Sequence, residues 1–339
     1  MILRLFISCL LIALFYVIYD EVVLWKETKS NVFGLISLPN NSNHNFNGII
    51  DKNYSKCSCV VFRVDDIQDY WLNSVQAAIM DTFLSKNQTL SLGLIMNGIG
   101  NDSKILEKIN QGMVKNLFEL DIHGWDHIDY TTLNESEQYD SLLKSNEKMQ
   151  NLFGLNSSIF IPPVSTFDNE TINAMNNLTL KILSSDIPTE TRFNQNKSIL
   201  DISDVSLDMI KKGNSEKSDL VAAYSSGGAD VFHIPATVFF KEYENGSWIQ
   251  IPVSEILSNV TNNIKNYGYA VIVLHPQDFA LYLNATEGSN PDPINSVDQN
   301  QISDLSKILN DLQSKKVRIV GFEDIIQFYT LRVLKYNDK

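Results

Sequence analysis

Short apolar segments alternate with amphipathic segments over most of the chain. The apolar segments are rich in Val, Ile and Phe, which is typical of buried β-strands. The predicted strands span residues 59–66, 89–96, 118–123, 159–162, 180–186, 230–234, 269–275 and 317–322. Helical periodicity occurs between most of them, at residues 71–85, 104–116, 135–153, 254–267 and 303–314. This alternation predicts right-handed βαβ crossovers and a parallel sheet.

The number of these repeats favours closure of the sheet into a barrel over an open sheet. An α/β barrel commonly needs about 250 residues, and the chain of 339 residues can hold one. Gly154 and Gly268 follow predicted helices where a C-cap glycine is expected. We therefore predict an α/β fold, a distorted (β/α) barrel of about seven or eight repeats, formed by residues 57–335 as a single domain.

The N-terminus carries a charge-free apolar run, residues 5–19, preceded by Arg4 and followed by two acidic residues. Its length fits a signal-peptide core better than a full membrane span of about 20 apolar residues. No small-x-small cleavage site follows, so an uncleaved anchor is equally workable for residues 1–25. Residues 26–56 are polar and Asn-rich, which predicts a linker. The protein is therefore expected outside the cell or on its surface, and in contact with the membrane if the N-terminal segment is retained.

Composition adds to this prediction of export. Asn-x-Ser/Thr sequons, the acceptors for N-glycosylation, begin at Asn40, Asn53, Asn87, Asn101, Asn134, Asn156, Asn169, Asn177, Asn196, Asn245, Asn259 and Asn284. Cys57 and Cys59 flank one residue, and either a disulfide or two free thiols fit them.

The net charge of −13 argues against nucleic acid or an anionic membrane surface as the main partner.

Ionisable residues occur at the ends of three predicted strands. Asp65 and Asp66 end the first strand, His123 and His127 follow another, and His275 ends a late one. Active sites of parallel α/β folds lie at the carboxyl ends of the strands. One carboxylate and two imidazoles suit Zn²⁺ with a position left for water. The second carboxylate and the third imidazole remain for proton transfer, so the pattern predicts a metal-assisted hydrolase.

These residues resemble the motifs of a known family. Asp65-Asp66, His123-x-x-x-His127, Pro162-Pro163 and Leu274-His275 follow the order of the polysaccharide deacetylase family, the NodB-homology family 4 carbohydrate esterases. The resemblance covers roughly residues 57 to 330. It implies the same distorted (β/α) barrel that the periodicity predicts.

The resemblance also implies a role for each motif residue. Asp65 corresponds to the general base, and His275 to the general acid. Asp66, His123 and His127 correspond to the ligands of a divalent metal ion, for which the donor set favours Zn²⁺. Asp186 matches the position of a carboxylate that orients the acid histidine. The implied substrate is an N-acetylated glycan, and the implied enzyme is a hydrolase of carbon–nitrogen bonds other than peptide bonds.

One motif departs from the family pattern. The chain reads Ile161-Pro162-Pro163 where the family reads Arg-Pro-Pro, so the arginine that orients the catalytic aspartate is absent. Arg63 lies two residues before Asp65 and shares its face of the strand. It either supplies the missing guanidinium from another direction or pairs structurally with a different carboxylate.

Two functions remain open at this point. The first is a metal-dependent deacetylase of an extracellular polysaccharide or glycoconjugate, with another C–N bond as a narrower alternative. The second is a catalytically silent glycan-binding or surface-structural barrel that lost activity with the motif arginine. Trp71 and Trp125 either form a sugar platform or only pack. Residues 284–300 are expected to form a long surface loop beside His275.

Overall fold

The computed structural model describes residues 57–186, 222–226, 229–244, 247–283 and 292–328. These residues belong to one compact unit, Ser55–Lys339. The predicted N-terminal segment and linker lie outside the described residues. Among the helices of the described part, none is long and apolar enough to cross a membrane.

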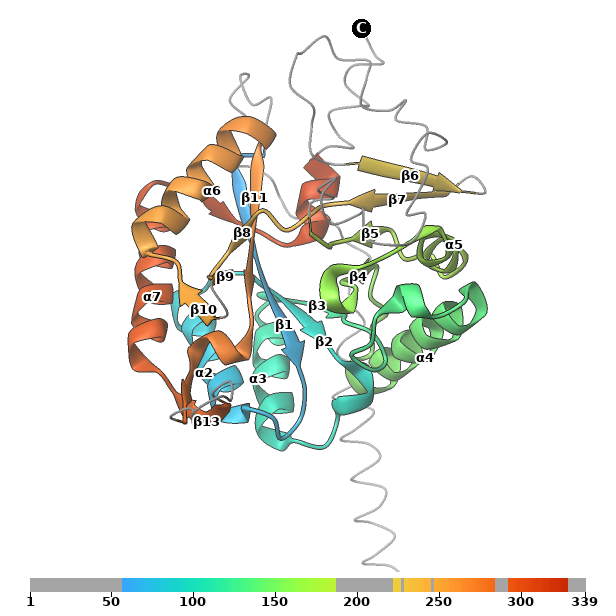
Figure 1. The fold of residues 1–339 in the computed structure, drawn as a ribbon, viewed down its shortest axis with the longest axis horizontal. Helices are drawn as coiled ribbons and strands as arrows, with labels where there is room; N and C mark the ends of the chain where they lie inside the picture. Colours follow the sequence, from blue (N-terminus) through green and yellow to red (C-terminus); the bar gives the residue numbers. More distant parts are fainter. Residues whose placement is uncertain (1–56, 187–221, 227–228, 245–246, 284–291, 329–339) are drawn as a thin grey trace, which may run out of the picture. The chain divides into compact units, whose positions relative to one another are not determined.

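A single curled sheet of ten strands forms the centre of this unit (Figure 1). Its order is β6-β7-β5-β4-β3-β2-β1-β11-β8, and β14 pairs with β1 beside this path. All pairs are parallel except β6 with β7. The strands are β1 (Cys59–Ile67), β2 (Leu90–Leu94), β3 (Phe118–Ile122), β4 (Ile159–Phe160), β5 (Ile182–Leu183), β6 (Ala222–Ser226), β7 (Ala229–His233), β8 (Val238–Phe239), β11 (Tyr269–Leu274) and β14 (Arg318–Ile319). The curled parallel sheet with its helices confirms the predicted distorted (β/α) barrel.

Helices connect the strands and cover the outer face of the sheet (Figure 1). They are α2 (Asn73–Lys86), α3 (Ser103–Val114), α4 (Glu135–Phe153), α5 (Asn169–Asn177), α6 (Val253–Tyr267) and α7 (Gln299–Ser314). Gly154 and Gly268 end α4 and α6 with φ of 75° and 91°, as predicted from the sequence. Helix α5 was not predicted, although Asp168 and Thr171 form a capping box at its start.

Alternation along β1 separates two apolar clusters. Val60, Phe62 and Val64 belong to a large cluster that includes buried residues of α2, α3, α4 and α7. Cys59 and Val61 belong to a smaller cluster inside the curl of the sheet. Successive side chains of a strand point to opposite faces, so Arg63 and Asp65 continue the inner row toward the carboxyl end. The inside of the barrel is therefore apolar at one end and polar at the end that carries the motifs.

Two hairpins extend from the carboxyl ends of the strands. They pair β9 (Lys241–Glu244) with β10 (Ser247–Gln250), and β12 (Ala280–Tyr282) with β13 (Pro293–Val297). The prediction of one surface loop over residues 284–300 is therefore wrong in part, since β13 is a paired strand and α7 begins at Gln299. Asn295 of β13 accepts from the Ser74 N–H at 2.8 Å and so fixes this hairpin to the start of α2. Cys57 and Cys59 form a disulfide at the start of β1.

Candidate metal and active site

An extra residue in β1 brings two consecutive carboxylates to the same end of the barrel. The register between β1 and β2 shifts between Val64 and Ile67, and Asp66 has a left-handed backbone with φ of 61°. Without this bulge, neighbouring residues of a strand would point to opposite faces. Asp66 can thus meet two histidines while Asp65 stays within the barrel. A left-handed backbone costs a non-glycine residue about 1–2 kcal/mol, so surrounding contacts must offset it.

Asp66, His123 and His127 form a ligand set that fits a metal ion. One ligand atom from each lies within 4.8 Å of the others. Asp66 Oδ1 is 3.2 Å from Nε2 of His123 and 3.2 Å from Nε2 of His127. Burial opposes ionisation of Asp66, but its contacts with both histidines hold the carboxyl pKa well below its usual range. An ionised carboxylate and two imidazole nitrogens are the donors that Zn²⁺ accepts.

The backbone of Ile161, in the motif that differs from the family pattern, fixes the orientation of His123. Nδ1 of His123 lies 2.8 Å from the carbonyl oxygen of Ile161, to which it donates in the tautomer that leaves Nε2 as an acceptor. The His123 side chain is almost fully buried, whereas that of His127 is 41% exposed. The site is therefore held from inside and open on the His127 side.

Gly93 of β2 lies under the site. A Cβ at this position would be 3.2 Å from Asp65 Oδ1 and 3.4 Å from Cβ of His123. A methyl group at this position would therefore be crowded. Glycine allows Asp65 and His123, which lie on either side of β2, to pack closely across it.

Arg63 pairs with Asp65, which is one of the two alternatives that the sequence left open. Its Nη2 donates to Oδ2 of Asp65 at 2.7 Å, and both side chains are almost fully buried. Its Nη1 donates to the carbonyl oxygen and to Oγ of Ser184, at 2.8 and 2.9 Å. Arg63 therefore pairs with Asp65 itself and not with a distant carboxylate. Ser184 was not predicted as a site residue, although it lies within the predicted strand 180–186.

His275 lies across from Asp65, at the end of β11. Its Nε2 is 4.0 Å from Asp65 Oδ2, and its Nδ1 is 3.7 Å from Asp278 Oδ2. Asp278 also accepts from the backbone N–H of His275 at 2.8 Å. Burial disfavours the charged imidazole, but the carboxylates of Asp278, Asp65 and Asp66 raise the pKa of His275 to about 9. The histidine is therefore protonated at neutral pH.

The structure places Asp278 beside His275. Asp186 forms a parallel bridge with Ala236 beyond β5. Asp278 follows His275 by three residues in a 3-10 turn, Pro276–Phe279, which brings its carboxylate back to the histidine. The orienting role predicted for Asp186 stays a prediction, and Asp278 occupies the position expected for such a group.

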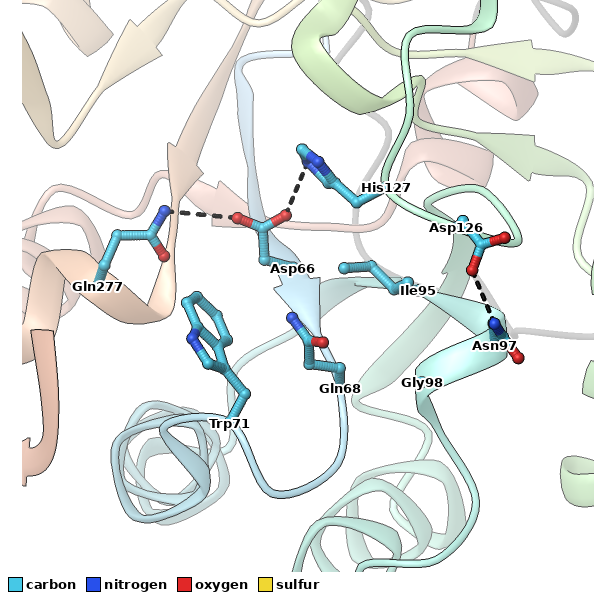
Figure 2. A pocket seen from close by; sticks show the side chains of 9 residues that line it. All are labelled: Asp66, Gln68, Trp71, Ile95, Asn97, Gly98, Asp126, His127 and Gln277. Carbon is cyan, nitrogen blue, oxygen red and sulfur yellow. Dashed lines mark hydrogen bonds and ion pairs between the residues drawn. The ribbon is translucent and has the colours of Figure 1, made fainter. Parts of the chain in front are cut away.

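A cleft of about 520 Å³ opens beside Asp66 and His127. Figure 2 shows Asp66 between His127 and Gln277, with Trp71 on the same wall as Gln277. Gln277 Nε2 is 3.4 Å from Asp66 Oδ2. On the other wall, Asn97 donates to Asp126 at 2.7 Å. Trp71 thus lines the cleft, and Gln277 was not predicted as a site residue.

Trp125 and His233 take structural positions. The Lys144 ammonium lies 3.7 Å from the centre of the Trp125 ring, and Trp125 does not line the cleft. His233 is fully buried, with Nε2 at 2.9 Å from Ser185 Oγ. Burial, together with the charge of Arg63, lowers the pKa of His233 to about 3, which keeps the imidazole neutral.

Two further carboxyl groups lie on the inner row of β3. Glu119 accepts from Ser91 Oγ and from the backbone N–H groups of Phe322 and Glu323, at 2.6, 2.8 and 3.1 Å. Burial nevertheless raises its pKa to about 7. Burial and the nearby carboxylates raise the pKa of Asp121 well above its usual range. The barrel interior therefore stabilises protonated carboxyl groups below the metal-ligand set.

The fold and the site together define a class: a parallel α/β half-barrel with an Asp/His/His set at its strand ends. The family model for polysaccharide deacetylase matches residues 52–183. This match confirms the resemblance to the family that the motifs predict. No curated protein sequence matches the chain.

One of three similar solved structures supports the fold at a TM-score above 0.5. A candidate polysaccharide deacetylase from Mycobacterium smegmatis aligns with a TM-score of 0.54 and 10% identity, over 84% of this chain and 93% of that one. The CE4 domain of a multidomain xylanase from the hindgut metagenome of Trinervitermes trinervoides aligns with a TM-score of 0.47 and 12% identity, over 80% and 91%. A CE4-family pseudoenzyme from Bacillus anthracis aligns with a TM-score of 0.46 and 13% identity, over 79% and 65%.

Proposed function

We propose that this protein is a metal-dependent hydrolase that removes N-acetyl groups from sugars of an extracellular polysaccharide or glycoconjugate. The observation that carries the proposal is the convergence of five side chains at one end of the barrel. Asp66, His123 and His127 offer ligand atoms within 4.8 Å of one another. Asp65 and His275 face each other beside them, with 4.0 Å between Oδ2 and Nε2.

Asp65 and His275 divide the proton transfers of amide hydrolysis between them. Asp65 accepts a proton from the attacking water, and His275 donates one to the departing amine nitrogen. Asp66, His123 and His127 would hold a divalent ion, which when bound would supply Lewis acidity to the amide carbonyl and to water. The donor set favours Zn²⁺ for this position.

The position of Arg63 favours an active enzyme over a silent barrel. The silent alternative rested on the missing arginine before Pro162. Arg63 presents its guanidinium to Asp65 from inside β1, with 2.7 Å between Nη2 and Oδ2. A charge-assisted hydrogen bond of this length restricts the orientation of the carboxylate.

Acetate release from a panel of N-acetylated oligosaccharides tests the proposal. Purified protein should bind about one divalent ion through the three candidate ligands and release acetate. Asp65→Asn should keep the metal and lose turnover, whereas Asp66→Ala should lose both. Asp140→Asn, on the exposed face of α4, is the matched control and should change neither. Bound metal without acetate release from any substrate would favour the silent glycan-binding barrel.

We also propose that the barrel lies outside the cytoplasm, behind a signal peptide or anchor in residues 1–25 and a linker in residues 26–56. The sequons and the Cys57–Cys59 disulfide support this location, since disulfides persist in oxidising compartments. Protease shaving of intact cells should remove the barrel. Mass spectrometry of the mature N-terminus would distinguish a cleaved signal from a retained anchor, and a barrel protected from protease in intact cells would contradict export.

A further inference from the structure

We propose that Ser184 is a positioning residue for the proposed reaction, acting through Arg63 on the general base Asp65. The inference rests on the proposed function and adds a residue outside the family motifs. Ser184 directly follows β5, four positions from β1 in the order of the sheet. Its hydroxyl and its carbonyl both accept from Nη1 of Arg63, at 2.9 and 2.8 Å.

The side chain of Arg63 spans the inside of the barrel. It begins on β1 and is only 1% exposed. Among the described residues, its guanidinium forms hydrogen bonds with Asp65 through Nη2 and with Ser184 through Nη1. The third nitrogen, Nε, is buried and has no hydrogen-bond partner in that part of the chain. Within the described part of the chain, Ser184 therefore holds the side of the guanidinium that faces away from Asp65.

The backbone around Ser184 is itself well fixed. Its N–H donates to the Phe160 carbonyl of β4 at 3.0 Å, and the N–H of Ala236 donates to the Ser185 carbonyl at 2.7 Å. The Ser184 side chain is fully buried. The carbonyl oxygen and the hydroxyl of Ser184 thus hold Nη1 of Arg63 in place, while Nη2 donates to Asp65. Rigid support behind a reacting group preserves its geometry during turnover.

The neighbouring serine offers a matched control. Ser185 is as buried as Ser184, but its hydroxyl contacts Nε2 of His233 at 2.9 Å instead of Arg63. Replacing either serine with alanine removes one hydroxyl from the same segment after β5. A general loosening of this segment would affect activity equally in both variants, whereas support of Arg63 involves Ser184 only.

A double-mutant cycle tests the inference with full-length, metal-loaded protein and N-acetylated oligosaccharides. Ser184→Ala should lower kcat about tenfold, the effect of one hydrogen bond to a charged group, with KM and bound metal unchanged. Ser185→Ala should change kcat less than about twofold by the same reasoning. In an Arg63→Met background, Ser184→Ala should have almost no further effect, because no guanidinium remains to be held. Equal losses in both backgrounds, or equal losses in both serine variants, would overturn the inference.

A second readout does not depend on activity. In protein labelled with ¹⁵N-arginine, rotation of the Arg63 guanidinium about its Nε–Cζ bond should be slow in the parent and in Ser185→Ala. It should be at least several-fold faster in Ser184→Ala. Unchanged rotation would refute the support of Arg63 by Ser184. Absence of acetate release from the parent, with the rotation changed as expected, would instead refute the proposed function and leave the contact intact.

Discussion

Replacement of Arg63 by methionine tests most directly whether Arg63 orients the carboxylate of Asp65. Methionine retains an unbranched side chain but removes the guanidinium and all three of its hydrogen bonds. The bond to Asp65 Oδ2 is 2.7 Å long, and the two to Ser184 are 2.8 and 2.9 Å long. Asp65 would then keep its place in the strand but lose the group that orients its carboxylate.

The expected losses follow from these contacts. Displacement of a catalytic group by about 1 Å can lower turnover about 100-fold, and we expect a loss in kcat of that size. Buried acceptors left without donors cost about 1–3 kcal/mol each, and partial relaxation suggests about 3 kcal/mol in the free energy of unfolding. At about 2–4 °C per kcal/mol, the melting temperature should fall by about 6–12 °C. Domains have net stabilities of about 5–15 kcal/mol, so the variant should still fold.

The assay separates catalysis from stability. Acetate release, bound metal and melting temperature are measured on the same preparation, with activity recorded well below the transition. Arg63→Lys should recover only part of the turnover, because one ammonium cannot reach both Asp65 and Ser184 as the guanidinium fork does. Unchanged acetate release from folded, metal-loaded Arg63→Met protein would refute the role of Arg63.

Three further predictions concern other parts of the barrel. His123→Ala should remove most metal affinity, by about 10–100-fold or more, and titration calorimetry with Zn²⁺ showing parental affinity would contradict the ligand set. Gly93→Ala should lower kcat several-fold with little effect on stability, since the added methyl crowds Asp65 Oδ1 at 3.2 Å; an unchanged kcat would show that the strand can shift. The pKa of Glu119 is about 7 in the folded protein and 4.5 for the free side chain. Between pH 4.5 and 7, the folded state therefore keeps a proton on Glu119 that the unfolded state has lost. Its contribution to stability is therefore present below about pH 4.5 and lost as pH rises to about 7, by at most about 3 kcal/mol. Glu119→Gln should abolish that part of the slope in urea unfolding curves recorded from pH 4.5 to 7.5, and parallel slopes in parent and variant would contradict the raised pKa.

The sequence predicted the parallel strands and the motifs at their ends because both follow from local patterns. Apolar runs identify β1, β3 and β11 without knowledge of their partners, and the ionisable residues after them must then share one end of the sheet. The two hairpins were missed because each strand in them is short. Strand β13, Pro293–Val297, contains neither an apolar run nor a clear alternation.

The site required contacts between distant residues that local patterns do not encode. The sequence left two alternatives for the partner of Arg63. Arg63 and Asp65 share one face of the strand, but this does not decide which carboxylate a long side chain contacts. Ser184 lies 121 residues from Arg63 in sequence, and only the curl of the sheet brings them together. The 3-10 turn after β11 folds the chain back within three residues and so brings Asp278 beside His275.

The hydrogen bond from His123 to the Ile161 carbonyl makes that part of the site indifferent to side-chain identity. Every amino acid brings the same carbonyl oxygen, so the arginine of the family motif could be exchanged for isoleucine without losing the acceptor for a metal ligand. In this chain the guanidinium beside Asp65 comes from Arg63 on β1 instead. The residue at position 161 can therefore differ without loss of this contact to the candidate metal ligand. Arginine at position 161 is disfavoured in this chain, because Ile161 is fully buried in the inner apolar cluster, where a further guanidinium would be an unpaired buried charge.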